Sequence, residues 1–171
     1  TLSEKGYQFH TETDTEVAAV FIDYCYQSAK NMISALKKAQ KRLKGSYAFG
    51  IINHKEPNVI YAMKKESPLV LGKTENELFL ASDPLAISSH TKEICYLKEG
   101  SIAKLENNKV TLFEEKEITP TWTTLNIEDS KADKNGYEHY MLKEIYEQPK
   151  VIENTIKPYL TENGTQNIPD L

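Results

Sequence analysis

Cysteine and histidine are the side chains of this sequence best suited to nucleophilic or metal chemistry. Cys25 falls within an apolar helical pattern and Cys95 within a strand pattern, and neither adjoins a histidine or a basic residue in sequence. Because the thiolate is the reactive form, both are predicted to be packed, inert side chains. No histidine has a second histidine or a cysteine at ligand spacing, which predicts surface histidines and no metal site. The histidines are His10, His54, His90 and His139.

A single carboxylate is placed where it could bind a ligand. Thr13–Glu16 fits a capping box, in which Thr13 accepts from a first-turn amide and Glu16 reaches back. Asp14 then lies in the first helical turn, where unpaired amides and the helix dipole favour an ionised carboxylate. An exposed carboxylate held in this way can receive the ammonium group of an amino acid. The alternative is that Asp14 only adds helix-favourable charge.

Charge and hydropathy exclude several classes of partner. The 171 residues carry a formal net charge of −4, which gives no basic field for nucleic acid or anionic lipid. The basic residues of 37–44 could form a phosphate or RNA patch, but a solvated helix face is the favoured interpretation. The longest apolar runs are too short to cross a membrane, and no apolar signal segment opens the chain. We therefore expect a cytoplasmic domain with no nucleic acid and no membrane partner.

Periodicity predicts helices, then strands, then helices. A short strand is predicted at Tyr7–Phe9, and a helix opening at Thr13 shows an apolar stripe through Val17, Val20, Phe21 and Tyr24. A second helix is predicted from about Ala29 to Leu43. Short β-type runs follow at Ser46–Ile52, Asn58–Met63, Leu69–Leu71, Leu78–Ala81, Glu93–Leu97, Ile102–Leu105 and Val110–Phe113.

Turn signals separate these strands. Asn107-Asn108 predicts a tight hairpin, Glu56-Pro57-Asn58 predicts a turn, and Ser82-Asp83-Pro84 opens one short helical turn. Trp122–Lys134 is polar and predicted to be irregular. A last apolar stripe from Tyr137 is predicted to end at Pro149, with a new helix after it.

This order indicates an α+β fold with layered antiparallel sheets. We expect one domain over residues 1–134 and a helical linker over residues 135–171. Leu2–Gly6 has the pattern of a helix's last turn, and residues 163–170 have that of a linker. We therefore expect further sequence on both sides of this chain.

Several segments resemble one enzyme family. The run His139–Pro149, within Asn135–Pro149, closely resembles the peptide that joins the two halves of the glucosamine-6-phosphate synthases, also called glutamine–fructose-6-phosphate aminotransferases (isomerizing). Gly6–Phe9 and Glu12–Val17 are similar to the family's Gly-Tyr-x-Phe and Glu-Thr-Asp-Thr-Glu-Val stretches. Three further segments resemble class II glutamine amidotransferases in order and spacing, namely Gly45–Ala48, Ser67–Gly72 and Ala81–Ala86.

The resemblance implies a fold and a reaction. The fold would be the N-terminal-nucleophile hydrolase type, a four-layer α/β/β/α sandwich, here incomplete at its N-terminus. The family's glutaminase half releases ammonia from glutamine, and a second domain uses that ammonia to convert fructose 6-phosphate to glucosamine 6-phosphate. Asp14 matches the aspartate that binds the α-ammonium group of glutamine. No metal or redox cofactor is implied, and the parent enzyme is expected to be a homo-oligomer.

The departures from the family pattern are equally informative. Thr1 is not the family's N-terminal cysteine nucleophile, so the resemblance implies no catalytic residue in this chain. The family's carboxylate-binding arginine, its Asn-Gly oxyanion pair and its sugar isomerase domain have no counterpart either. We expect that this chain alone hydrolyses no glutamine. Two alternatives stay open: a class II amidotransferase with another acceptor, and a non-catalytic module that binds an amino acid at Asp14.

Overall fold

The computed structural model describes residues 1–29, 31–126 and 134–159. Two compact units are distinguished, Thr1–Asn126 and Ile127–Leu171, and each is described by itself. The helices of the first unit are η1 (Ser3–Lys5), α1 (Asp14–Ala29), α2 (Met32–Gln40) and η2 (Pro84–Ile87), and those of the second are α3 (Tyr140–Ile156) and η4 (Lys157–Tyr159). The strands are β1 (Tyr47–Asn53), β2 (Glu56–Lys65), β3 (Val70–Lys73), β4 (Leu78–Ala81), β5 (Glu93–Tyr96), β6 (Ile102–Glu106), β7 (Lys109–Phe113), β8 (Glu117–Ile118) and β9 (Thr123–Thr124).

The strands form two antiparallel sheets. One has the order β1-β2-β6-β7-β8 and the other the order β4-β3-β5-β9. The sequence-based predictions of β1 to β7 are confirmed, as is the hairpin, whose turn residues Asn107 and Asn108 have φ of 48° and 58°. The strands β8 and β9 were not predicted, because a strand of two residues has no readable alternation.

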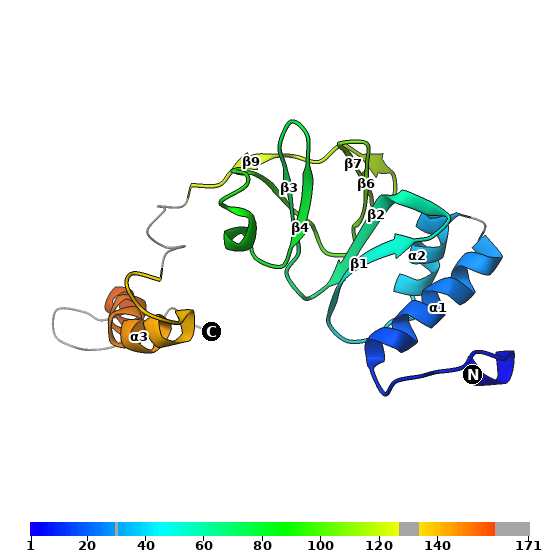
Figure 1. Ribbon diagram of the computed structural model, residues 1–171, viewed down its shortest axis with the longest axis horizontal. Helices are drawn as coiled ribbons and strands as arrows, with labels where there is room; N and C mark the ends of the chain where they lie inside the picture. Colours follow the sequence, from blue (N-terminus) through cyan, green and yellow to red (C-terminus); the bar gives the residue numbers. More distant parts are fainter. Residues whose placement is uncertain (30, 127–133, 160–171) are drawn as a thin grey trace. The chain divides into compact units, whose positions relative to one another are not determined.

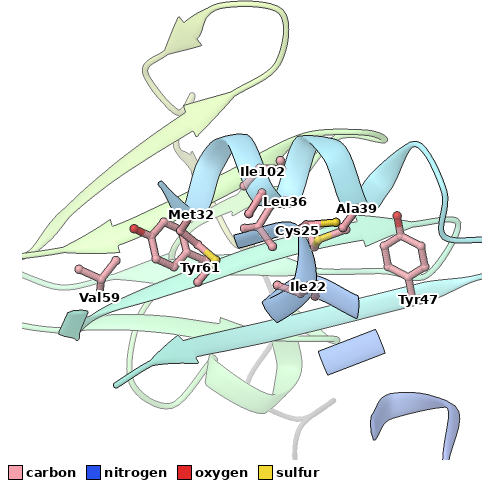
Figure 2. Close-up of a cluster of buried hydrophobic side chains, with 11 residues drawn as sticks. Ile22, Cys25, Met32, Leu36, Ala39, Tyr47, Val59, Tyr61 and Ile102 are labelled. Atoms are coloured by element: carbon pink, nitrogen blue, oxygen red, sulfur yellow. The ribbon is translucent and has the colours of Figure 1, made fainter. Parts of the chain in front are cut away.

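The helices α1 and α2 cover one face of the five-stranded sheet (Figure 1). The predicted apolar stripe of α1 is partly wrong, because Val17 is 47% exposed while Ala18, Ile22 and Cys25 are buried. In α2, Leu36 is fully buried, as predicted. Figure 2 shows the cluster that these helices form with β1, β2 and β6; its buried members are Ile22, Cys25, Met32, Ala35, Leu36, Ala39, Tyr47, Val59, Tyr61, Met63 and Ile102.

A second core lies between the two sheets. Ala62 of β2 points away from the helices and packs in a cluster with Leu71 and Cys95 of the other sheet. The sheets approach closely at Gly50, where an added Cβ would lie 3.0 Å from Leu80 Cδ2. The two sheets therefore pack face to face, as predicted.

The outer face of the four-stranded sheet carries a smaller cluster. Val70 and Ile94 pack there against Ile87 of η2. Asp83 caps this short helix through a 2.7 Å hydrogen bond from the Leu85 amide, which confirms the predicted helical turn. Within the described residues, η2 covers this face of the sheet. A four-layer sandwich would have its second helical layer at the same place.

Other sequence-based predictions need correction. Tyr7–Phe9 is not a strand, because an extended segment becomes one only when a partner strand pairs with it. Glu56-Pro57-Asn58 lies inside β2 rather than in a turn, and the chain reverses at His54-Lys55 instead. The helix α3 continues through Pro149, since a proline removes one helical hydrogen bond and leaves those on either side.

Candidate functional site

The loop before α1 is organised by one carboxylate. Glu16 Oε1 accepts from the His10 amide at 2.8 Å, and Oε2 accepts from the Thr11 amide at 2.7 Å and the Thr11 hydroxyl at 2.6 Å. The Thr13 hydroxyl accepts from the Glu16 amide at 3.4 Å. The Thr13 half of the predicted capping box is confirmed. The other half is not formed, because Glu16 reaches past Thr13 to the two residues before it and the Thr13 amide donates to Thr11 Oγ1 instead.

These contacts also act on the charge of Glu16. The hydrogen bond from the Thr11 hydroxyl, followed by that from the His10 amide, lowers the pKa of the Glu16 carboxyl below its usual 4.5. The carboxylate is therefore held in its charged form while it fixes the loop. This arrangement sets the position at which α1 begins.

Asp14 is the first residue of α1, and its side chain is exposed. The contact found for it among the described residues is a 3.4 Å hydrogen bond from the Thr15 hydroxyl to Asp14 Oδ1. No lysine or arginine of the described chain pairs with it. Its carboxylate can therefore accept a cationic group from outside, at a helix end where the backbone amides support the negative charge.

A groove of about 390 Å³ runs between α1 and β1. Thr15, the neighbour of Asp14, lines it, whereas Asp14 itself does not. The sequence did not reveal the groove. The lining residues are Thr15, Ala18, Ala19, Ile22, Asp23, Tyr26, Gln27, Met32, Phe49, Gly50, Ile51, Ile52, Asn53, His54 and Lys55.

Both cysteines are buried, as their sequence context predicted. Cys25 is fully buried under α2, and Cys95 lies between the sheets at 4% exposure. Burial raises the pKa of both thiols, so each is held in the unreactive thiol form. Neither cysteine is placed to act as a nucleophile.

Further features of the described residues bear on ligands. No group of three or more metal-binding side chains is found in the part of the chain that the structure describes. None of its described helices is long and apolar enough to span a bilayer. In the basic segment, Lys38 Nζ donates to Ser28 Oγ at 2.9 Å, while Lys41 and Arg42 are exposed. This favours the solvated helix face over a phosphate site.

Comparisons with known proteins agree with these features. Residues 1–89 match the family model described as a glutamine amidotransferase domain. The chain is 43% identical over 157 residues to the glutamine–fructose-6-phosphate aminotransferase (isomerizing) of Clostridium acetobutylicum, which covers 91% of this chain and 26% of that protein. The Aquifex aeolicus protein of the same name is 42% identical over 168 residues, covering 94% of this chain and 27% of that protein. This chain thus spans about a quarter of the length of the curated relatives it matches.

A solved structure shares the fold. The glutamine phosphoribosylpyrophosphate amidotransferase from B. subtilis superposes with a TM-score of 0.58 at 21% identity, over 66% of this chain and 25% of that chain. At that identity the likeness carries the fold alone. It confirms the α+β class and the N-terminal-nucleophile hydrolase type, and the curated relatives confirm the family resemblance seen in the sequence.

Proposed function

This chain belongs to the glutamine amidotransferase domain family, and from that premise we propose that it is part of the glutaminase half of a glutamine–fructose-6-phosphate aminotransferase (isomerizing). The observation that carries the proposal is the 43% identity over 91% of the chain to the Clostridium acetobutylicum protein of that name. An amidotransferase with another acceptor has less support, since the phosphoribosylpyrophosphate enzyme shares 21% identity.

In the proposed reaction, the glutaminase half hydrolyses the side-chain amide of glutamine to glutamate and ammonia. The ammonia then reaches a separate isomerase domain, where fructose 6-phosphate becomes glucosamine 6-phosphate. The part taken by residues 1–171 is the binding of glutamine, and the sugar phosphate binds elsewhere in the enzyme. We further propose that the parent enzyme is cytoplasmic and homo-oligomeric, and that it binds neither nucleic acid nor membrane.

Asp14 is the residue that we assign to glutamine binding. Its exposed carboxylate lies at the N-terminal end of a 16-residue helix, and the loop before it is fixed by Glu16. A charged hydrogen bond to the α-ammonium group of the substrate would complete its coordination. Thr15 supports the geometry, because its hydroxyl donates to Asp14 Oδ1 and orients the carboxylate.

A hybrid enzyme tests this role. The matched residues of the Clostridium acetobutylicum enzyme are replaced by those of this chain, and glucosamine 6-phosphate formation is measured. We expect the hybrid to be active. Asp14→Asn should raise the KM for glutamine about ten- to a hundredfold, the loss of one hydrogen bond to a charged group. Glu12→Gln, a nearby exposed glutamate, is the matched control and should leave KM unchanged. A folded but inactive hybrid, or an unchanged KM in Asp14→Asn, contradicts the assignment.

We also propose that the chain by itself hydrolyses no glutamine, because its two thiols are buried and protonated. The test is incubation of the purified chain with glutamine and measurement of glutamate against a blank without protein. Glutamate release above that blank would contradict the proposal that the chain alone is inactive. The binding role of Asp14 would still be tested separately by the hybrid enzyme.

A further inference from the structure

The turn that leads into α3 contains an asparagine followed by a glycine (Figure 1). Asn135 and Gly136 are both exposed, and the chain reverses there, because the Tyr137 amide donates to the Lys134 carbonyl at 3.0 Å. Their φ values are 51° and 84°. Two successive positive φ values define the type I′ turn, for which Asn-Gly is a preferred pair. The sequence also contains Asn163-Gly164, which lies outside the described residues.

An Asn-Gly pair can react with itself. The backbone nitrogen of Gly136 attacks Cγ of the Asn135 side-chain amide, so that a bond from this nitrogen to Cγ forms and the bond from Cγ to Nδ2 breaks. Nδ2 leaves as ammonia and takes the proton of the Gly136 amide. Water then opens the cyclic imide, which gives aspartate or isoaspartate, according to the carbonyl it attacks. Glycine favours the first step because it has no side chain to crowd the attacking nitrogen.

The reacting groups are not engaged elsewhere. In the part of the chain that the structure describes, neither the Asn135 side chain nor the Gly136 amide has a hydrogen-bond partner. A Cβ built on Gly136 would meet nothing within 4 Å, so water has access to the pair. The other turn asparagines differ, because Asn107 is followed by Asn108, and the Asn108 side-chain amide donates to the Glu75 carbonyl.

The closed turn holds the two reacting atoms apart. In a type I′ turn the first central residue has a ψ of about 30°, which directs the next nitrogen away from the side chain of that residue. Formation of the cyclic imide requires the Gly136 nitrogen and the Asn135 Cγ on the same side. The turn must therefore open, with loss of the hydrogen bond from Tyr137 to Lys134, before the reaction can begin.

Contacts with α3 hold this turn closed. The ring of Tyr137 stacks on that of Tyr146, with the centroids 5.6 Å apart and the planes at 22°. Lys134 Nζ donates to the Glu138 carbonyl at 3.0 Å and lies 5.5 Å from the centre of the Tyr140 ring. The residues on both sides of the Asn-Gly pair are thus attached to the first part of α3 or to the residues just before it. These contacts slow the opening of the turn without blocking the pair from water.

We propose that Asn135 is a site of spontaneous deamidation, whose rate is controlled by the opening of its turn and by the stack of Tyr137 on Tyr146. Both products add a negative charge at the entry to α3. Isoaspartate also lengthens the backbone of the turn by an additional carbon atom, so the hydrogen bond from Tyr137 to Lys134 cannot form again with the same geometry. The inference does not depend on the proposed function, since the reaction needs only water.

Timed incubation of the full chain tests the proposal. Samples kept in neutral buffer, with and without urea, are digested, and the conversion of amide to acid in the Asn135 peptide is followed by mass spectrometry. We expect conversion in buffer to be about tenfold slower than in urea, the effect of one hydrogen bond and one aromatic pair on opening. A protease that cleaves at aspartate but not at isoaspartate separates the two products. Asn135 conversion no faster than that of Asn107 in urea, or equal Asn135 rates with and without urea, would overturn the proposal.

A matched pair of variants tests the stack. Tyr146→Leu removes one ring and leaves the sequence around Asn135 unchanged, so it should speed deamidation in buffer about three- to tenfold. Tyr159→Leu, at another exposed tyrosine of the same unit, should leave the rate unchanged. Both variants must retain the far-ultraviolet circular dichroism of the parent chain and should react at the parent's rate in urea. Equal rates for the two variants in buffer would overturn the control by the stack. The hybrid enzyme reports on the proposed function separately, because it measures turnover.

Discussion

The carboxylate of Glu16 and the residue Thr11 form a closed pair, in which the amide and the hydroxyl of Thr11 both donate to Glu16 Oε2, at 2.7 and 2.6 Å. This pair fixes the loop that leads into Asp14. It therefore connects the stability of the N-terminal loop to the geometry of the proposed ammonium site.

Replacing Glu16 should change how stability depends on pH. The pKa of Glu16 is lowered in the folded chain from 4.5, so its contribution is present above that value and is lost as pH falls through the lower folded value. Glu16→Gln should therefore be less stable than the parent near neutral pH, and the difference should shrink in acid. Urea unfolding at several pH values measures this. Glu12→Gln is the control, and a difference that does not depend on pH would contradict the expectation.

The sequence was sufficient for elements with a long, regular pattern. Val110–Phe113 alternates clearly, and the adjacent Asn107-Asn108 pair has the chemistry of a tight turn, so both were predicted correctly. The buried face of α1 was harder, because Val17 and Ala18 are both apolar and only packing decides which points inward. Pro149 misled the prediction, since a proline weakens a helix without always ending it.

The candidate site was predictable only in part. Asp14 was predicted from its place in a capping sequence, together with the family resemblance, and its role in binding stays a proposal. The groove was not found, because it depends on α1 lying beside β1, a contact between segments about thirty residues apart that leaves no periodic signal. Whether β1 would lie at the edge or in the middle of its sheet was equally invisible, since its apolar pattern suits both.

Two buried tyrosines should differ in how much stability the chain loses when the hydroxyl is removed. The Tyr61 hydroxyl donates to Glu56 Oε1 at 3.1 Å, whereas the described residues offer no partner to the buried Tyr47 hydroxyl. Tyr61→Phe should lower the free energy of unfolding by about 1 kcal/mol, and Tyr47→Phe should leave it unchanged or raise it. Urea unfolding of the two matched variants checks this, and an equal loss in both would show that the hydrogen bond is not the cause.

Adding a methyl group at Gly72 should strain the outer face of the four-stranded sheet. A Cβ there would lie 2.7 Å from Ile87 Cδ1 and 2.8 Å from Thr91 Cγ2. Thr91 cannot move easily, because its hydroxyl donates to the Lys73 carbonyl and accepts from the Glu93 amide. Gly72→Ala should therefore cost about 1–3 kcal/mol of unfolding free energy, as overpacking does.

A double-mutant cycle isolates this clash. Ile87→Val removes the Cδ1 atom that the new methyl group would meet, so Gly72→Ala should cost less in the Ile87→Val background than in the parent chain. Gly50→Ala is the comparison, because its Cβ would meet one flexible atom, Leu80 Cδ2, at 3.0 Å. Its cost should be smaller. Additive effects in the cycle would contradict the proposed clash.

The hairpin between β6 and β7 should depend on the backbone of Asn107 rather than on its side chain. Asn107 has a φ of 48°, and left-handed backbone of this kind costs an ordinary residue about 1–2 kcal/mol, while glycine adopts it without strain. Asn107→Ala should therefore lower the free energy of unfolding by about 1 kcal/mol or more, and Asn107→Gly should leave it nearly unchanged. Thermal or urea unfolding of the two variants measures the difference. Asn108 is unsuitable for this comparison, because its side-chain amide donates to the Glu75 carbonyl and its replacement would remove a second contact. Equal losses in Asn107→Ala and Asn107→Gly would assign a role to the side chain instead of the turn geometry.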